Sequence, residues 1–597
     1  MILVTTALED TFPENNKEKI LFLGEWCKLY SRRSFWSKFD SETLDYHWDD
    51  RGKLHADYVY LQELYEELIE ELVTKLNEIH AVNHSARYWR ILIGPWLGYF
   101  IHALFDRWFL LEQAIETKNI TKCRVIKQNP MDVIPNDMEH FISIFIGDDW
   151  NEAIFAQLLE MYWSKSILIK KVQLKRINKV SVKSPWQSLR LKMKCIFKRW
   201  INCFNALLPG KGKYFFISTY LPLKVDVSLQ MHFDQLPRLW QDFPVPVKNS
   251  NQKSRKWKLD GLEASSNRFS EVARKMIPMH IPTAYLEGYD ALSKKAELLP
   301  RPHHPKVIFT SNAYSADDLF KAWAAKKTEL KVPLVIGQHG GHFGMSPFSF
   351  HEEHQIKIAT KWLSWGWSDP SRANILPIGM FKNFNTTVKY NPKGGALMVE
   401  AAIPRYSYHL YAVPVSRQWL DYFDDQQKFL KFLPNSLRSQ ILLRLYNRDY
   451  GWNQALRWRD DMPEVRIDPG HQNIVKLIRK SRLYISTYNA TTYLEALNWN
   501  IPTIIFWNPE HWELKEEVKP YFDMLESVGI FHKTPQSAAK KMTEVWDKIE
   551  NWWYSTEVQE ARGKFIDQYA ATSDDKLDLL KSALMESGKL SSGKIKI

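Results

Sequence analysis

One histidine lies among glycines directly after a short apolar run, where open α/β sheets place their ligands. The run is the expected strand 332–336, and the segment after it reads Gly337-Gln338-His339-Gly340-Gly341. Glycines let the backbone approach a ligand closely, and a histidine titrates near neutral pH, as a general base for a hydroxyl group must. We therefore predict that His339 is a general base. The alternative is a tight turn whose histidine only hydrogen-bonds its neighbours.

A second group of polar side chains lies between an expected strand at 483–486 and an expected helix at 491–498. Its candidate residues are Asn489, Thr491, Thr492 and Glu495. The first N–H groups of a helix are free and carry a partial positive charge, so a phosphate suits this position. We predict that the amide and hydroxyl side chains bind the donor phosphates and that Glu495 accepts ribose hydroxyls. Ordinary helix capping, with Glu495 completing a capping box, is the alternative.

Two arginines in the same half of the chain could bind a phosphate-bearing donor. Arg405 follows the expected strand 396–399, and Arg444 lies within the expected strand 441–445. A guanidinium group pairs with phosphate oxygens through two N–H groups and can neutralise a leaving group. Arg444 alternates within its strand and could be structural, so Arg405 is the stronger candidate.

Acidic side chains follow the first expected strand, which begins at Ile2. Glu9 and Asp10 come where this strand ends, so they could face a ligand. Glu9 is therefore an alternative general base to His339. Helix capping or simple solvation explains these acids equally well.

Several motifs of other enzyme classes are missing from the sequence. It contains no P-loop, no GxGxxG, no HExxH and no GxSxG. An Asp-x-Asp element after a strand is also missing. We therefore expect neither a metal site nor a cofactor.

The elements that must position these residues begin with expected strands at 2–6 and 19–24 and expected helices at 54–79 and 85–118. From residue 214 onwards strands and helices alternate, up to an expected strand at 503–506, which predicts βαβ units and parallel sheets. A Pro- and Gly-containing segment at 391–395 interrupts the alternation. The expected fold class is α/β, with two Rossmann-like domains facing a cleft. These are an acceptor-side domain at 1–390 with helical insertions and a donor-binding domain at 391–580, followed by a flexible tail at 581–597.

A strongly basic segment interrupts the N-terminal half. Residues 161–225 contain fifteen Lys and Arg and no acid, although the whole chain has a net charge of only +13. Apolar residues recur there at helical spacing, at Trp186, Leu189, Met193, Phe197, Trp200, Phe204 and Leu207. Such a helix suits the surface of an anionic membrane. A solvated surface helix is the alternative, and nucleic-acid binding is not expected because no nucleic-acid-binding motif accompanies the charge.

Cysteine usage and hydropathy predict a cytoplasmic protein. The four cysteines have neither metal-site spacing nor the density of a disulfide framework. The N-terminus lacks the basic start of a signal peptide, and the most apolar stretch, 91–111, contains a proline and charged residues. A position at the inner face of a bacterial inner membrane agrees with the basic segment.

Several motifs together resemble a family of bacterial transferases found in O-antigen and surface-polysaccharide gene clusters. They are the segments 5–9, 87–96, 149–151, 337–341, 363–367, 449–452 and 489–497. The resemblance covers essentially the whole chain and implies a GT-B fold. More distantly, the His-Gly segment and the helix start are similar to glycerophosphotransferases of teichoic acid synthesis and to capsule transferases that use CMP-activated acidic sugars. That similarity implies that His339 is the base and that Asn489, Thr491 and Thr492 hold phosphates.

The expected activity is therefore that of a glycosyltransferase. It would move a sugar from a nucleotide-sugar donor to a lipid-linked or growing surface polysaccharide of the O-antigen (lipopolysaccharide) type. Two alternatives stay open: a glycerophosphotransferase-like enzyme, and a non-catalytic carbohydrate-binding protein with the same fold.

Overall fold

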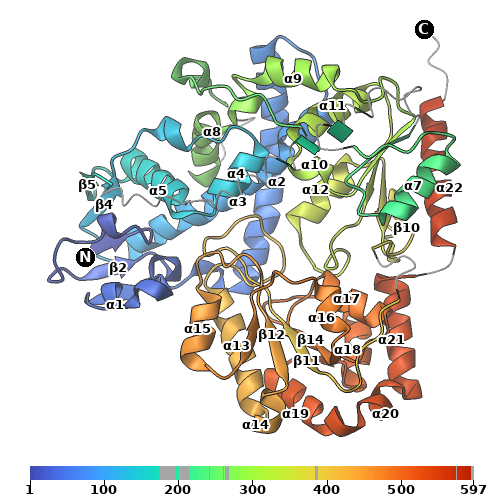
Figure 1. Cartoon of the computed structure of the whole chain (residues 1–597). Helices are drawn as coiled ribbons and strands as arrows, with labels where there is room; N and C mark the ends of the chain where they lie inside the picture. Colours follow the sequence, from blue (N-terminus) through green and yellow to red (C-terminus); the bar gives the residue numbers. More distant parts are fainter. Residues whose placement is uncertain are drawn as a thin grey trace.

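Three parallel sheets form the framework of the described part of the chain. The computed structural model describes residues 1–174, 193, 196–197, 200–201, 204, 214–240, 243–259, 261, 268–382, 387–572 and 575–592. Figure 1 shows the first two sheets in the upper part of the molecule and the third in a lower lobe. The predicted α/β class with Rossmann-like sheets is confirmed, although three sheets are present where two were expected.

The first sheet is built from the N-terminal residues in the order β3-β2-β1-β4-β5. Its strands are β1 (Ile2–Val4), β2 (Ile20–Phe22), β3 (Ser41–Thr43), β4 (Lys122–Ile126) and β5 (Leu168–Val172). Only the first two were expected from the sequence. Both edge strands are partly exposed, as edge strands often are. β3 is short and polar and β5 contains two lysines, so neither gives a continuous apolar run to detect.

Two long helices join the first sheet to the second. These are α2 (Arg51–His80) and α3 (Ala86–Thr117), close to the helices predicted at 54–79 and 85–118. At 32 residues, α3 is about 48 Å long. It packs on α2, on α5 (Asp148–Tyr162) beside the first sheet, and on α11 (Asp318–Glu329) and α12 (Phe350–Ile358) beside the second. One buried helix therefore serves as a common core for both sheets.

A glycine in α3 permits the closest of these contacts. A Cβ atom added at Gly98 would lie 1.8 Å from the ring of Phe350 in α12. The ring thus occupies the volume that any other side chain would fill. The two glycines of the apolar α3, Gly94 and Gly98, therefore serve packing within the protein.

The second sheet has the strand order β10-β9-β8-β7-β6. Its strands are β6 (Tyr214–Ile217), β7 (Val307–Thr310), β8 (Leu334–Gly337), β9 (Lys361–Ser364) and β10 (Ile375–Pro377). The helices around it include α7 (Leu223–His232), α8 (Arg268–His280), α9 (Tyr289–Leu298) and α10 (Ala313–Ala316). The carboxyl ends of these strands carry the candidate histidine.

The third sheet forms the lower lobe, with the order β13-β12-β11-β14-β15-β16. Its strands are β11 (Gly395–Val399), β12 (Ile441–Arg444), β13 (Arg466–Asp468), β14 (Ser481–Ser486), β15 (Thr503–Phe506) and β16 (Phe531–His532). The chain reverses its direction across the sheet between β11 and β14, where open α/β sheets bind ligands. The helix α17 (Thr491–Asn498) starts beside this point.

The C-terminal residues return to the second sheet. After α21 (Thr556–Tyr569) in the lower lobe, α22 (Lys576–Ser592) lies beside α7 in the upper part (Figure 1). Leu580 and Leu584 are fully buried in the same apolar cluster as Phe309 of β7. This helix corrects the prediction of a flexible tail from residue 581, because a polar sequence with a narrow apolar stripe is ordered here by packing.

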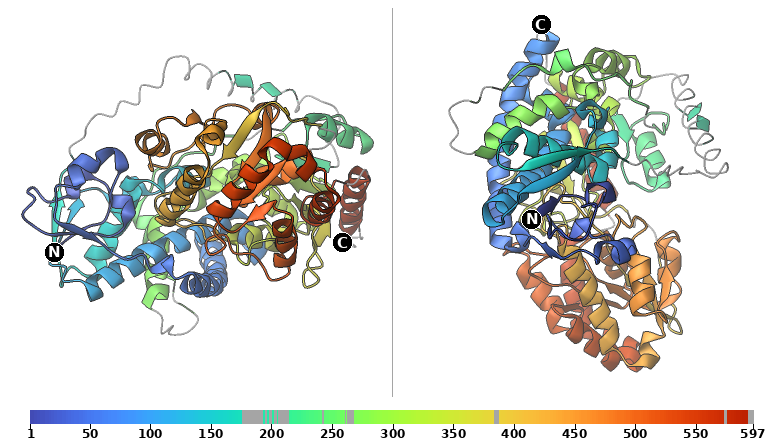
Figure 2. Two further views of the ribbon diagram at one scale, coloured as in Figure 1. Left: turned by 90° about the horizontal axis from the view of Figure 1, so that it is seen from below. Right: turned by 90° about the vertical axis from the view of Figure 1, so that its left-hand side faces the viewer.

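The basic segment at 161–225 is not one insertion within a domain. Its first part contributes β5 to the first sheet and its last part contributes β6 to the second, so it connects two sheets. In the left-hand view of Figure 2, the blue residues near the N-terminus and the green residues that follow β6 lie on opposite sides of the molecule. Most of the predicted amphipathic helix at 186–207 lies outside the described residues.

Candidate active site

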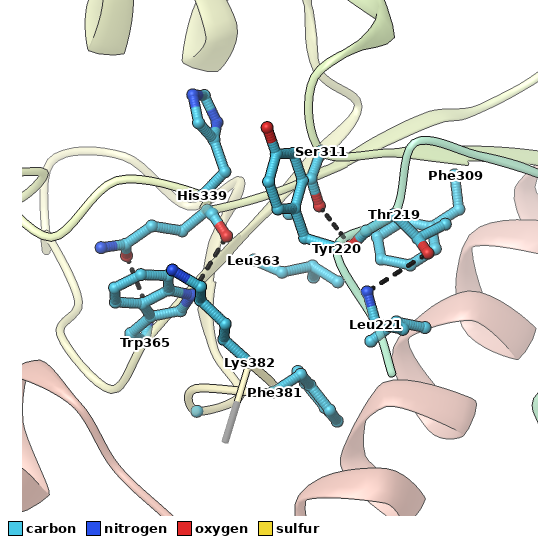
Figure 3. Close-up of a pocket in the computed structure, with 13 residues that line it drawn as sticks. Thr219, Tyr220, Leu221, Phe309, Ser311, His339, Leu363, Trp365, Phe381 and Lys382 are labelled. Atoms are coloured by element: carbon cyan, nitrogen blue, oxygen red, sulfur yellow. Dashed lines mark hydrogen bonds between the residues drawn. The ribbon is translucent and has the colours of Figure 1, made fainter. Parts of the chain in front are cut away.

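A cavity of about 420 Å³ lies at the carboxyl ends of the second sheet (Figure 3). All five strands contribute to it through the residues that follow them. The lining residues include Thr219 and Tyr220 after β6, Ser311 after β7, His339 after β8, Trp365 after β9 and Lys382 after β10. The cavity thus occupies the position where a parallel sheet is expected to bind a ligand.

His339 carries the titratable group of this cavity that is best placed to accept a proton. Burial lowers the pKa of its imidazole to about 4, and a hydrogen bond with the backbone of Ser311 opposes this shift. Its Nδ1 atom is buried and has no hydrogen-bond partner among the described residues. The ring stacks on Tyr220, with centroids 5.8 Å apart. At neutral pH the imidazole is therefore uncharged and holds an unshared lone pair.

Gln338 positions the loop. Its Oε1 accepts hydrogen bonds from the backbone N–H of Trp365 (2.9 Å) and from Nε1 of Trp367 (3.0 Å). Its Nε2 donates to the carbonyl oxygen of Gly340 at 2.8 Å. Both polar atoms of the amide therefore have partners within the protein, and Gln338 fixes the path of the backbone on both sides of His339.

The two predicted motifs meet although 150 residues separate them in the chain. The backbone N–H of Gly341 donates to Oγ1 of Thr491, the first residue of α17, at 3.2 Å. A Cβ atom at Gly341 would lie 2.6 Å from the carbonyl carbon and oxygen of Ala490. The N-cap of α17 is Ala490, which has no side chain able to cap the helix. The histidine loop therefore lies directly against an uncapped helix start.

We expect Gly341→Ala to separate these two segments. The new methyl group cannot fit against the Ala490 backbone, so the protein should lose about 1–3 kcal/mol of stability, typical of overpacking. Transferase activity should fall with it. Gly340→Ala is the matched control, since a Cβ there would meet only side-chain atoms, at 3.4 Å. Equal unfolding midpoints and equal activities for the two variants would show that the contact is unimportant.

The other predicted phosphate-site residues are engaged in contacts around α17. Oδ1 of Asn489 accepts a hydrogen bond from the hydroxyl of Tyr493 at 3.0 Å, and Oγ1 of Thr492 accepts one from Tyr484 at 2.8 Å. Glu495 is 4% exposed and pairs with Lys382 at 3.0 Å, so it does not complete a capping box. Because Lys382 also lines the cavity, this ion pair ties the cavity to α17.

Arg405 lies in a different place from the one predicted. Its guanidinium group donates to a carboxylate oxygen of Asp148 at 2.6 Å, to the carbonyl oxygen of Trp26 and to that of Tyr450. All three nitrogens are thus engaged within the protein, and the residue is 6% exposed. These contacts join the third sheet to the N-terminal residues, and donor binding by Arg405 stays a prediction that they do not support.

Arg444 is also structural. Its Nη1 pairs with Oδ2 of Asp468 in the neighbouring strand β13 at 2.7 Å, and its Nη2 donates to the carbonyl oxygen of Gly470. Asp468 therefore neutralises the charge of Arg444 within the protein. The prediction that Arg444 binds the donor is therefore not supported.

The end of β1 does not form a second site. Glu9 pairs with Arg32 in a partly exposed ion pair and does not line the cavity of His339. Where β1 and β4 separate, the buried carboxylate of Glu152 accepts hydrogen bonds from the hydroxyls of Thr5 and Thr6 and from the N–H of Ile126. An internal side chain therefore fills the ligand position of the first sheet, and the alternative that Glu9 is the base stays a prediction that this arrangement does not support.

Sequence reasoning missed several residues of the cavity. Tyr220 and Ser311 each follow an expected strand of the second sheet, so inspecting the end of every strand would have named them. Lys382 lies outside any recognisable motif. Within the described part of the chain, no group of three or more His, Cys, Asp or Glu side chains is arranged to hold a metal ion.

Comparisons with known proteins give one family match and several distant structural ones. A family model described as LIC12162 family transferase matches residues 1–584. No curated protein matches the sequence. Among solved structures, the wall teichoic acid polymerase TagF is 12% identical, with 68% of this chain and 98% of that chain covered and a TM-score of 0.30. MurG of Acinetobacter baumannii is 9% identical, covering 63% and 99% with a TM-score of 0.31.

A third solved structure is WaaG, a glycosyltransferase involved in lipopolysaccharide biosynthesis. It is 13% identical, with 64% of this chain and 100% of that chain covered and a TM-score of 0.27. At these TM-scores the fold rests on the three sheets themselves.

Proposed function

Because this chain belongs to the LIC12162 family of transferases, we propose that it transfers a sugar from a nucleotide-sugar donor to a hydroxyl group of a surface polysaccharide. The acceptor we propose is a lipid-linked or growing chain of the O-antigen type. The observation that carries this proposal is the contact between the His339 loop and the uncapped start of α17. It brings a proton acceptor next to a position suited to phosphate.

In this proposal each group has one role. The uncharged imidazole of His339 takes the proton of the attacking hydroxyl, and its unpartnered Nδ1 is the accepting atom. The first N–H groups of α17 and the hydroxyl of Thr491 stabilise the negative charge that develops on the departing nucleotide. We expect transfer without a metal ion or a cofactor, because the helix start supplies the positive potential.

Thermal unfolding with CMP, UDP, GDP and dTDP tests the donor site. A nucleotide at a hundred times its Kd should stabilise the protein by about 2.7 kcal/mol. We expect a shift with one base, and a smaller one after Thr491→Val. The control is Thr74→Val, an exposed threonine of α2. No shift with any nucleotide, or the same shift for both variants, would count against the proposal.

Two other functions give different results in the same assays. A glycerophosphotransferase would turn over CDP-glycerol without transferring any sugar. A non-catalytic carbohydrate-binding protein would leave cellular polysaccharide unchanged when His339 is replaced. The unpartnered Nδ1 of His339 favours an enzyme over a non-catalytic carbohydrate-binding protein.

A peripheral position at the inner face of the bacterial membrane completes the proposal. Five described apolar residues within 193–204 are 56–73% exposed: Met193, Ile196, Phe197, Trp200 and Phe204. Each nearby Lys or Arg contributes about 1 kcal/mol at an anionic surface. In the described part of the chain, no helix is both long and apolar enough to cross a bilayer.

We expect the protein to float with vesicles that contain anionic lipid and not with neutral ones. Phe204→Ala should reduce the bound fraction, because an exposed aromatic ring would no longer enter the interface. Phe432→Ala, an exposed phenylalanine at the end of α13 (Gln418–Phe432), is the matched control. Equal binding to both kinds of vesicle, or to neither, would refute membrane docking.

A further inference from the structure

A second hollow, of about 230 Å³, lies at the carboxyl end of the third sheet. It opens between α13 and the segments that follow β14 and β15. Its described lining residues are Tyr422, Asp425, Gln426, Thr487, Phe506, Trp507, Asn508, His511 and Trp512.

Two fully buried side chains of this hollow have unsatisfied polar atoms. Oε1 of Gln426 has no hydrogen-bond partner among the described residues, and neither has Nε1 of Trp507. The two residues are 0% and 2% exposed. A buried polar group without a partner costs about 1–3 kcal/mol, so native proteins keep few of them. Both residues line the hollow, so an acceptor and a donor without partners lie in its wall.

The lining residues disfavour an anionic ligand, although Lys428 pairs with Asp425 and Arg51 and Arg417 lie near His511. None of the described residues that line the hollow is Lys or Arg, and Asp425 places a carboxylate there. Burial lowers the pKa of His511 to about 4, so its ring is uncharged at neutral pH. A phosphate or an acidic sugar would find no cation among these side chains. The carboxylate and amides instead present paired atoms that suit neighbouring hydroxyl groups.

The aromatic lining suits a sugar ring better than a flat base. The ring of Trp512 is tilted by 61° from that of Tyr422 and by 44° from that of Trp507, with centroids 6.3 Å apart in both pairs. Such tilted rings cannot stack on both faces of one planar base. A sugar can place its C–H groups against one ring and direct its hydroxyls at the polar side chains around it.

The position of the hollow relates it to the proposed phosphate site. Thr487 lines it and lies in the loop between β14 and α17, the helix that begins at Thr491. The ring of Tyr488, the next residue, lies 6.4 Å from that of Trp512. A group attached to a phosphate at the start of α17 is therefore close to the hollow.

We propose that the hollow between α13 and the ends of β14 and β15 binds an uncharged sugar ring. Its identification as the sugar of the donor rests on the proposed function, whereas sugar binding itself does not. The donor class would then be a nucleotide-linked neutral sugar rather than an acidic sugar or glycerol.

Saturation-transfer NMR with free glucose, N-acetylglucosamine and glucuronate at millimolar concentration tests this site on the full chain. We expect transfer to the two neutral sugars and none to glucuronate. Gln426→Met keeps the length of the side chain and removes its amide, and it should weaken neutral-sugar binding about tenfold. Trp507→Phe removes only the indole N–H and part of the ring, and it should act in the same direction.

The matched control is Gln427→Met, because the Gln427 amide donates to Asp461 and does not line the hollow. No transfer to any sugar, equal transfer to glucuronate, or the same affinity in the Gln426 and Gln427 variants would each overturn the proposal. The wild-type protein could bind neutral sugars, lose this binding in the Gln426 variant, and yet be stabilised against unfolding by no nucleotide. This combination would support the sugar site and refute the proposed function.

Discussion

Replacing His339 by alanine is expected to lower kcat by about 10²–10⁴-fold, the contribution of a positioned general base. The imidazole is the group in the cavity with a buried, unpartnered nitrogen, so its removal leaves no acceptor for the hydroxyl proton. The measurement is sugar transfer at saturating donor, with the unfolding midpoint as a check on folding. His339→Asn should behave like the alanine variant, because an amide cannot accept the proton.

The control for this prediction is His342→Ala in the same loop. The ring of His342 packs on Phe343 and Tyr411 and does not line the cavity, so transfer should change far less. Equal losses in the two variants would refute the assignment of the base.

The pH profile gives a second readout of the same residue. A base must be unprotonated, so kcat/KM falls as pH falls through its pKa in the free enzyme. Burial lowers the pKa of His339 to about 4. If His339 is the base, kcat/KM should stay constant down to about pH 5 and decline below it, whereas a base with an ordinary histidine pKa would give a decline near pH 6.5.

Arg405→Met is expected to destabilise the protein by about 3–5 kcal/mol, the usual cost of breaking a buried ion pair. The substitution keeps the aliphatic part of the side chain and leaves the carboxylate of Asp148, the carbonyl of Trp26 and that of Tyr450 without their shared donor. Because these partners belong to different parts of the chain, the third sheet should lose one of its attachments to the N-terminal residues. Urea-induced unfolding measures the effect.

Arg448→Met is the matched control, since Arg448 is exposed and should cost under about 1 kcal/mol. The donor hypothesis from the sequence makes the opposite prediction, namely a weaker affinity for nucleotide with little change in stability. An Arg405 variant that unfolds like the wild type but binds nucleotide poorly would restore that hypothesis.

Local pattern was enough to predict the two long helices and many strands of the second and third sheets. The apolar spacing of α2 and α3, the apolar runs of β8, β11 and β15, and the polar start of α17 each lie within one short segment. Helix and strand periodicity depend on neighbouring residues, so a single sequence records them. The same reasoning indicated that the His339 loop and the Thr491 helix start follow strands, where ligands bind in α/β sheets.

Whether a polar side chain is paired within the protein or available to a ligand depends instead on residues far away in the chain. Arg405 and Arg444 have the spacing of phosphate ligands, yet Asp148 and Asp468 satisfy their charges. The carboxylate of Glu152 fills the ligand position of the first sheet, and Gln338 is bound by two tryptophans. No local pattern distinguishes a charged group that is already paired from one that is available to a ligand.

By itself, the sequence determined the α/β class, the long helices and the two segments that carry the candidate chemistry, because these follow from residue type and periodicity over a few turns. Only the tertiary structure decided that Gly341 lies against Thr491, that the N-terminal strands form a sheet of their own, and that α22 packs on the second sheet. These outcomes depend on the burial and pairing of groups distant in the chain, and such long-range contacts leave no periodic record in the sequence.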